Sequence, residues 1–230
     1  MNELDLVVFD LVGTTIQDRG EVPNALQDAF LAHGLQIGLA DVRRFRGLSK
    51  RELIQHLLAE QTATVARDLE AKADAVYRDF ENRLLRAFGE DGVHPVEGAT
   101  ATFAWLKGKG VKVVLSTGLN RKITDRVLDQ PDWGSGLIDA SVCLDDVSQG
   151  RPAPYLIFRA MQKVGAASVH RVAAVGDTRS DLQAAYNAGV SVAIGVLSGG
   201  HSREELSAEP HTALVDSVAN LPTLWSSDLS

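Results

Sequence analysis

Four short apolar runs, separated by segments with helical periodicity, constrain the fold of this chain more than any other feature. They lie at Leu4–Phe9, Val111–Leu115, Val172–Val175 and Val190–Ile194. Each run is nearly continuous rather than alternating, which is typical of strands buried on both faces of a parallel sheet. The sequence therefore predicts an α/β fold.

The segments between these runs carry apolar residues at three- and four-residue spacing, as helices that pack on a sheet do. They are Ala99–Lys107, Arg121–Leu128, Pro154–Val164 and Asp181–Ala188. Connections between parallel strands are right-handed crossovers. We therefore expect a doubly wound parallel sheet with helices on both faces, which is a three-layer, Rossmann-like core.

Residues 18–92 differ from the rest because they hold no strand-like run. They have helical periodicity instead, at Asn24–Ala32, Lys50–Ala59 and Val65–Phe88. We therefore predict a catalytic core of residues 1–17 and 93–230 and an all-helical insert of residues 18–92 directly after the first strand. Two crossings would join the parts, so that hinge motion over the first strand's loop is available.

Composition limits the partners of the chain. The 230 residues carry a formal net charge of -7, which argues against a surface built for nucleic acid or anionic lipid. The single cysteine, Cys143, cannot form an internal disulfide. The N-terminus lacks an export signal, and no stretch approaches the roughly 18 apolar residues that span a bilayer. We expect a cytoplasmic protein with a small-molecule partner.

Asp10 ends the first apolar run and is followed by Gly13-Thr14-Thr15. Ligands bind at the carboxyl ends of strands in open α/β sheets, and the Gly-Thr-Thr turn supplies backbone and hydroxyl donors there. The carboxylate of Asp10 can act as a nucleophile. The alternative is an aspartate that only caps a turn or a helix, and it loses weight because polar partners recur at later strand ends.

Hydroxyl and cationic groups follow two later segments. Ser116, Thr117 and Gly118 come directly after the second apolar run, where the Thr117 hydroxyl and the Gly118 amide can hold a phosphoryl oxygen. Arg151 lies in a Gly-Arg-Pro segment and can neutralise the charge that a carboxylate and a phosphoryl group bring to one pocket. The alternatives are a helix cap at Thr117 and a surface position for Arg151.

Two acids follow the third apolar run. Asp177 ends this run and Asp181 lies one helical turn further on, so that both can face the same crevice as Asp10. Carboxylates are hard oxygen donors, which suit Mg²⁺. A capped helix start is the alternative, and Asp181 can serve both purposes.

Taken in order, these four elements resemble the haloacid dehalogenase superfamily of hydrolases. The resemblance covers the core on both sides of the insert and implies that Asp10 is the nucleophile. It also implies that Mg²⁺ binds Asp10, the backbone carbonyl of Val12 and Asp177, with Asp181 supporting the waters of the metal. The insert corresponds to the helical cap of that superfamily.

The same resemblance assigns the phosphoryl oxygens to Thr117 and Arg151. Most phosphatases of the superfamily place a second aspartate two residues after the nucleophile, where it protonates the leaving oxygen. Val12 occupies that position here. Hydrolysis of an ordinary ester would therefore lack its usual acid.

The phosphonoacetaldehyde hydrolase branch lacks this aspartate too, and the chain resembles it at Asp145-Asp146-Val147, Gly150-Arg151-Pro152 and Gly176–Asp181. That branch has a cap lysine, in a Gly-Leu-x-Lys segment, that forms a Schiff base with the substrate aldehyde. Gly47 and Lys50 match the segment here. An iminium at Lys50 would accept the electrons left on carbon when a carbon–phosphorus bond breaks. A closed cap would favour the neutral amine by desolvation.

Three positions around the substrate differ from that branch. Leu53 stands in place of a histidine, Arg46 in place of a methionine, and Leu119 in place of a tyrosine. We therefore predict a phosphonatase-like, Mg²⁺-dependent hydrolase of a small phosphonate or phosphate metabolite. The alternatives are a phosphate monoester phosphatase of the phosphoglycolate phosphatase type, with Lys50 an exposed helix-start residue, and a catalytically weak phosphate-binding regulatory protein. Relatives of the phosphonatase type pair through their caps, so a homodimer is also open.

Overall fold

A six-stranded parallel sheet forms the centre of the computed structural model, which describes residues 4–44, 49–61, 66–90, 92–131, 133 and 136–227. The strand order is β3-β2-β1-β4-β5-β6, so β1 lies in the interior between β2 and β4. The strands are β1 (Leu6–Asp10), β2 (Lys112–Ser116), β3 (Ala140–Val142), β4 (Val172–Gly176), β5 (Val192–Val196) and β6 (Ala213–Val215). The predicted α/β class and parallel sheet are confirmed.

The four predicted runs are β1, β2, β4 and β5, whereas β3 and β6 were not predicted from the sequence. Each of these two is only three residues long and lies at an edge of the sheet, where most of its residues are only partly buried. The predicted end of the fourth run was wrong, because β5 continues through Gly195 and Val196. Gly195 fits there because a Cβ atom would lie 2.5 Å from the side chain of Leu214 on β6.

Helices cover both faces of the sheet, and alternate residues of β1 show the division. Val7 and Phe9 pack with Phe103 of α5 in one buried cluster, whereas Leu6 and Val8 belong to the other. The second cluster includes residues of α7 and α8, among them Leu156 and Leu182. The core helices are α5 (Ala99–Gly108), α6 (Arg121–Leu128), α7 (Tyr155–Val164), α8 (Arg179–Ala188), α9 (Arg203–Ser207) and α10 (Leu221–Ser227), with 3-10 turns at Leu144–Asp146, Val169–Arg171 and Val218–Asn220.

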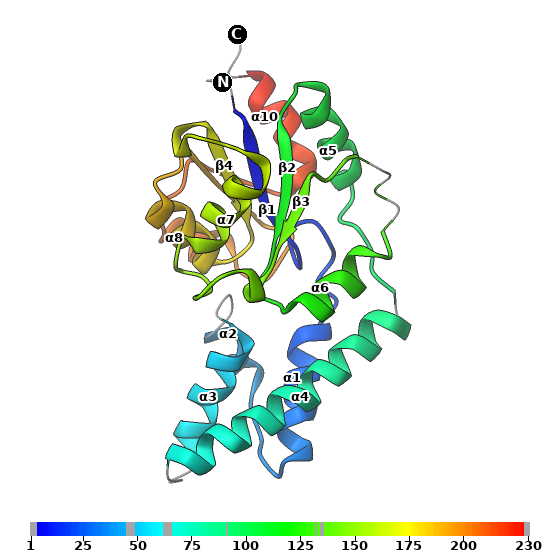
Figure 1. Ribbon diagram of the computed structural model, residues 1–230, viewed down its shortest axis with the longest axis vertical. Coiled ribbons are helices and arrows are strands. Elements are labelled where there is room, and N and C mark those ends of the chain that lie inside the picture. Colours follow the sequence, from blue (N-terminus) through cyan, green and yellow to red (C-terminus); the bar gives the residue numbers. More distant parts are fainter. Residues whose placement is uncertain are drawn as a thin grey trace.

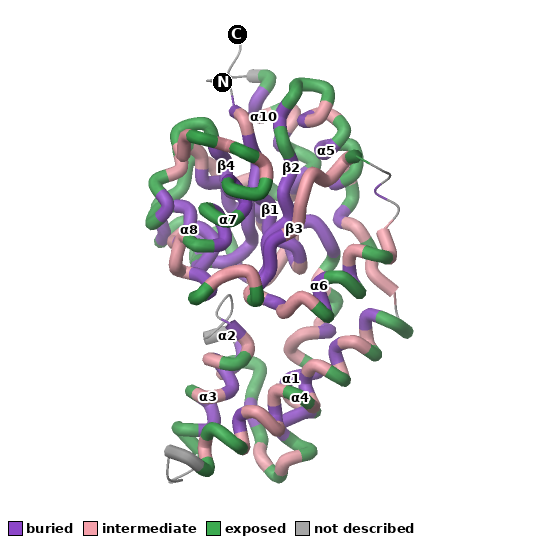
Figure 2. The backbone as a smooth tube through the Cα atoms, viewed as in Figure 1, coloured by how far each residue is buried: buried purple, intermediate pink, exposed green. Residues whose placement is uncertain are grey.

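Four further helices lie beyond the carboxyl ends of the strands (Figure 1). They are α1 (Glu21–Ala32), α2 (Leu39–Arg44), α3 (Lys50–Gln61) and α4 (Ala66–Glu90), and we call them the helical cap. The long helix α4 packs against α1 and α3 within the cap and against α6 of the core. Buried residues run along the facing sides of these helices (Figure 2). The cap falls within the predicted insert, and the division into two domains with the stated boundaries stays a prediction.

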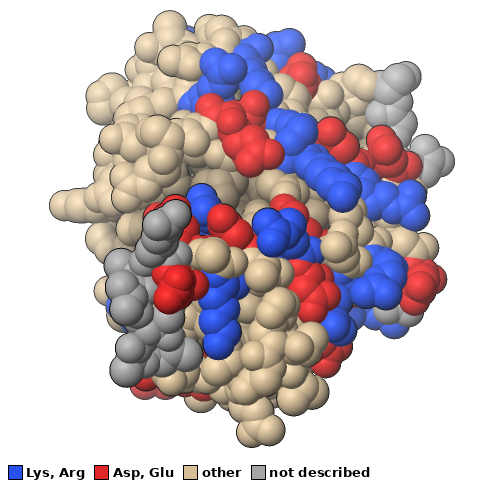
Figure 3. Space-filling view, turned by 60° about the horizontal axis from the view of Figure 1, so that its bottom comes forward, with Lys and Arg blue, Asp and Glu red and all other residues tan. Residues whose placement is uncertain are grey.

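The charged residues are mixed on the face that carries the cap. Figure 3 shows basic and acidic side chains interspersed there. A surface that binds nucleic acid instead gathers its basic side chains into one extended patch. Within the described ranges, the helices include none that is both long and apolar enough to cross a membrane.

Asp139 ties the start of β3 to its neighbours. Its carboxylate accepts hydrogen bonds from Lys107 Nζ at 2.7 Å, from Lys112 Nζ at 3.2 Å and from the Val113 amide at 2.8 Å. Burial opposes ionisation of Asp139, but these donors outweigh it and hold its pKa below the ordinary value of 3.8. A carboxyl with a lowered folded-state pKa stabilises the fold above its unfolded-state pKa and loses that contribution as the pH falls through the folded-state pKa.

We therefore expect Asp139→Asn to lower the free energy of unfolding at neutral pH by about 1–2 kcal/mol, because hydrogen bonds to a charged group are lost. The difference from wild type should shrink as the pH falls below 3.8. Urea denaturation across a pH series measures this. Asp125→Asn is the control, since the Asp125 side chain is 58% exposed. A difference that does not change with pH would contradict the assignment.

Candidate active site

Arg151 and Asp10 form a buried ion pair at the centre of the site. Arg151 Nη1 lies 2.5 Å from Asp10 Oδ1, and its Nε lies 2.9 Å from Asp181 Oδ1. Its Nη2 donates to Ser116 Oγ at 2.6 Å. The strand ends therefore bring together the predicted nucleophile, the predicted cation and Ser116, and the alternative of a surface position for Arg151 is wrong.

Asp177 is fixed by groups from two loops. Its Oδ1 accepts from Thr14 Oγ1 at 3.1 Å, and its Oδ2 accepts from the Gly200 amide at 2.6 Å. A Cβ atom at Gly199 would lie 2.1 Å from Oδ2, and one at Gly13 would lie 2.5 Å from it. The glycine-rich loop after β5, which contains Gly199 and Gly200, therefore closes directly on Asp177.

Asp181 both caps α8 and faces the site. Thr178 and Asp181 form a capping box, in which Asp181 Oδ2 accepts from the Thr178 amide at 3.0 Å. The other carboxylate oxygen faces Arg151. Asp181 therefore serves both predicted purposes, as part of the N-terminal capping box of α8 and as a carboxylate of the site.

Three buried carboxylates make up an acidic cluster. Asp10, Asp177 and Asp181 each present an oxygen atom within 4.8 Å of the others. Burial raises the pKa of Asp10 to about 8, Arg151 opposes this rise, and the charges of Asp181 and Asp177 add to it. Three carboxylates face one guanidinium, so the negative charge of the ionised cluster would exceed what Arg151 offsets. Hard oxygen donors with excess negative charge fit a divalent cation such as Mg²⁺.

Thr117 and Gly118 lie in the loop after β2 and line the same pocket as Asp10. Thr117 is not the N-cap of the helix that follows. That position is taken by Asn120, whose side chain accepts from the Ile123 amide. Thr117 Oγ1 instead accepts from the Leu119 amide at 3.2 Å, so it keeps its own proton available for donation.

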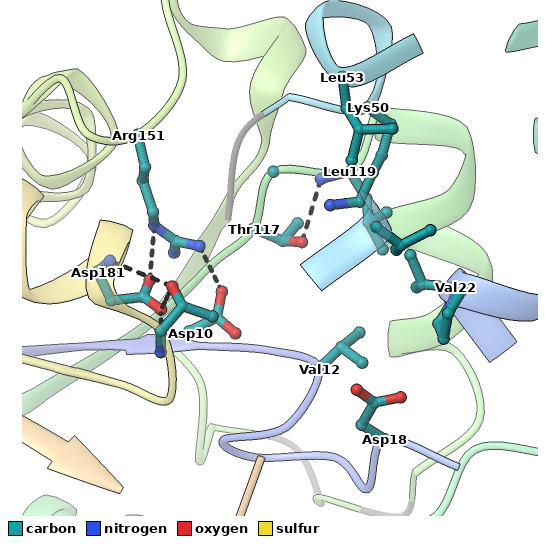
Figure 4. A pocket seen from close by; sticks show the side chains of 14 residues that line it. Asp10, Val12, Asp18, Val22, Lys50, Leu53, Thr117, Leu119, Arg151 and Asp181 are labelled. Atoms are coloured by element: carbon teal, nitrogen blue, oxygen red, sulfur yellow. Dashed lines mark hydrogen bonds and ion pairs between the residues drawn. The ribbon is translucent and has the colours of Figure 1, made fainter. Parts of the chain in front are cut away.

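Lys50, the first residue of α3, also lines this pocket. Its amine points into the pocket, toward Thr117 (Figure 4). The structure therefore places Lys50 across the pocket from Asp10 rather than on an outer surface of the cap. Arg46 and Gly47, from the same predicted segment, lie outside the described residues.

Part of the pocket was not predicted from the sequence. The side chain of Val12, at the position predicted to lack the usual acid, faces the cavity, and Asp18 lies beside it (Figure 4). Val22 and Val42, from the cap, line the cavity as well. Nothing in their spacing marks these residues, because they reach the pocket only through the docking of the cap on the core. Among the residues that the structure describes, the lining is Asp10, Val12, Asp18, Val22, Pro23, Val42, Lys50, Leu53, Thr117, Gly118, Leu119, Arg151, Thr178 and Asp181.

Comparison with known proteins agrees with this geometry. The family model of the haloacid dehalogenase-like hydrolases matches residues 4–189. A phosphonoacetaldehyde hydrolase of Lysinibacillus sphaericus is 32% identical over 221 residues, which cover 92% of this chain and 81% of the relative. The phosphonoacetaldehyde hydrolase of Parabacteroides distasonis is 30% identical over 223 residues, covering 91% and 84%.

A solved structure shows the same fold. A phosphonoacetaldehyde hydrolase-like protein of Oleispira antarctica superimposes with a TM-score of 0.85 at 21% identity, covering 98% of this chain and 92% of that one. The strand-end acids, the sheet topology and the match over most of the length agree. This chain therefore belongs to the haloacid dehalogenase-like hydrolases and is a hydrolytic enzyme.

Proposed function

We propose that this hydrolase is a Mg²⁺-dependent, phosphonatase-like enzyme of the cytoplasm that cleaves a small phosphonate or phosphate metabolite with Asp10 as its nucleophile. The observation that carries the proposal is that Lys50 of the cap and Asp10 of the core line one pocket. Identity of 30% and 32% to proteins named phosphonoacetaldehyde hydrolase supports the same chemistry.

In this proposal, residues of the core attack the phosphorus atom and bind the phosphoryl oxygens. The ionised carboxylate of Asp10 attacks the phosphorus atom and forms an aspartyl-phosphate, which water then hydrolyses. Arg151 favours the ionised form of Asp10 and, with Thr117 and the Gly118 amide, binds the phosphoryl oxygens. Ser116 Oγ accepts a hydrogen bond from Nη2 of Arg151 and so helps to hold the guanidinium in place.

The acidic cluster holds the metal in this proposal. Its ligands are Asp10, Asp177 and the backbone carbonyl of Val12, with Asp181 supporting the waters of the metal. Mg²⁺, when bound, offsets the negative charge that a phosphoryl group adds to three buried carboxylates. Thr14 and Gly200 keep Asp177 oriented for this role.

In this proposal, Lys50 reacts with the carbonyl carbon of a phosphonate substrate. Its neutral amine adds to the carbonyl group and expels water, which leaves an iminium. As the bond from Asp10 to phosphorus forms, the carbon–phosphorus bond breaks and its electron pair becomes an enamine. The enamine takes a proton on carbon, and water then releases the carbonyl product from Lys50. No acid at position 12 is needed, in agreement with Val12.

Hydrolysis of a phosphate monoester is the second candidate, and one observation favours it. The carboxylate of Asp18 points toward the pocket next to Val12 (Figure 4), near the position where most phosphatases of the superfamily carry their acid. A protonated Asp18 would donate to a leaving oxygen. Lys50 would not be needed for that reaction.

Substitutions at Asp10 and Lys50 separate these candidates. We expect Asp10→Asn to abolish phosphate release from every substrate, by at least about 1,000-fold, because the nucleophile is lost. Lys50→Arg should abolish cleavage of phosphonoacetaldehyde while keeping the positive charge, because a guanidinium does not form an iminium at neutral pH. Borohydride with phosphonoacetaldehyde should label wild type and not the arginine variant, as mass spectrometry would show. Ester cleavage that survives Lys50→Arg, without cleavage of the phosphonate, would establish the second candidate instead.

Gly199→Ala tests the metal site without removing a ligand. Its Cβ atom would lie 2.1 Å from Asp177 Oδ2, so Asp177 has to move. We expect Mg²⁺ affinity, measured by isothermal titration calorimetry, to fall by about 10-fold or more, as it does when groups that orient a ligand are lost. Gly108→Ala is the matched control, because nothing lies within 4 Å of a Cβ atom there. Equal affinities of the two variants would argue against Asp177 as a ligand.

A further inference from the structure

The pocket has two chemically different sides. On the core side lie charged and hydroxyl groups that suit a phosphoryl group, namely Asp10, Thr117, Arg151 and Asp181. The other side carries apolar side chains. Four of them come from the cap, namely Val22, Pro23, Val42 and Leu53. The other two, Val12 and Leu119, come from the core.

The apolar side is part of the packed interior rather than a loose surface. Leu53 is fully buried, Leu119 is 5% exposed and Val42 is 7% exposed, and all three belong to the larger hydrophobic cluster. Val12 and Val22 pack against that cluster. These side chains offer no hydrogen bonds, so they favour an apolar group on the substrate.

Lys50 stands where the two sides meet. Figure 4 shows its amine directed toward Thr117, with Val22 and Leu119 on the opposite side from Asp10. A carbonyl carbon bonded to this amine would place its phosphorus-bearing substituent toward Asp10. Its second substituent would then face the apolar side chains.

We infer that the substrate is a 2-oxoalkylphosphonate, in which the carbonyl carbon carries an apolar alkyl group in place of the hydrogen atom of an aldehyde. The inference rests on the carbon–phosphorus cleavage proposed above and narrows its substrate class. The reaction adds one water molecule to R–CO–CH₂–PO₃²⁻ and yields the methyl ketone R–CO–CH₃ and phosphate. Lys50 accepts the electron pair of the broken bond as an enamine, and a proton replaces phosphorus on carbon.

Charge in the pocket selects against the polar alternative. Among the described lining residues on this side, the charged groups are Lys50 and Asp18. Lys50 is occupied by the iminium during the reaction, and Asp18 repels an anion. A carboxylate in place of the alkyl group would therefore be desolvated against valine and leucine side chains beside a like charge.

Two substrates of nearly equal size test the inference. In 3-methyl-2-oxobutylphosphonate the substituent R is isopropyl, and in 3-phosphonopyruvate it is a carboxylate. We expect kcat/KM for the isopropyl ketone to exceed that for the carboxylate by at least about 10-fold, which is within the range of discrimination by an apolar pocket. Equal values, or a preference for the carboxylate, would overturn the inference.

Phosphonoacetaldehyde, with hydrogen as R, separates this inference from the proposed function. Cleavage of the aldehyde by the wild type but of neither larger substrate would leave the proposed function standing and refute the apolar substituent. Absence of Lys50-dependent phosphate release from all three compounds would refute the proposed function itself.

A matched pair of variants tests the apolar side of the pocket directly. Val22→Thr keeps the branched shape of the side chain but replaces one methyl group with a hydroxyl group. It should lower the ratio of kcat/KM for the isopropyl ketone to that for phosphonoacetaldehyde by about 5-fold or more. Val164→Thr makes the same change at a partly buried position on α7, outside the pocket, and should leave the ratio at the wild-type value. The same ratio in both variants would count against Val22 as a contact of the alkyl group.

Discussion

Neutralisation of buried negative charge at the carboxyl ends of β1 and β4 is the constraint on which the rest of the site depends. Asp10 and Asp181 share one guanidinium, that of Arg151, and Asp177 lies close enough to raise the pKa of Asp10 further. A phosphoryl group would bring more negative charge to the same place. The Mg²⁺ that we propose would offset this charge, and the need to balance charge explains why Arg151 and the acidic cluster occur together.

The close approach of loops makes this concentration of charge possible. A Cβ atom on Gly13 or Gly199 would collide with the Asp177 side chain. In the same way, a Cβ atom on Gly176 would lie 2.3 Å from the Cβ atom of Asp181. Gly13 also has φ near +95°, which residues with a side chain rarely adopt. Glycine at these places lets backbone amides reach the carboxylates directly. Backbone amides therefore help to hold Asp177 and Asp181 in place, and backbone moves less than side chains do.

Strand-end residues could be predicted from the sequence because a single rule, binding at the carboxyl ends of parallel strands, brings Asp10, Thr117 and Asp177 to one edge. The long buried strands could be predicted for a similar reason, since burial on both faces leaves continuous apolar runs. The edge strands β3 and β6 leave no such run, because they are short and half covered. Asp18, Val22 and Val42 escaped prediction for a different reason. Their place in the pocket depends on how the cap docks, and neither spacing nor composition encodes that contact locally.

Docking of the cap is therefore what brings Lys50 into the same pocket as Asp10. Helix α4 contacts α6, where Asn120 Nδ2 donates to Glu81 and Gln130 Nε2 donates to the Phe88 carbonyl at 2.9 Å. Burial and the neighbouring Glu81 raise the pKa of Tyr77 on the same helix, so its hydroxyl remains a donor in this interface. Lys50 lies on α3, which packs on α4 and makes none of these contacts. This interface holds the cap against the core, and residues of α1, α2 and α3 can change the apolar side of the pocket without altering it. In the proposed mechanism, the apolar lining residues of the cap, Val22, Val42 and Leu53, can then change without disturbing the acidic cluster, because they belong to a different part of the fold.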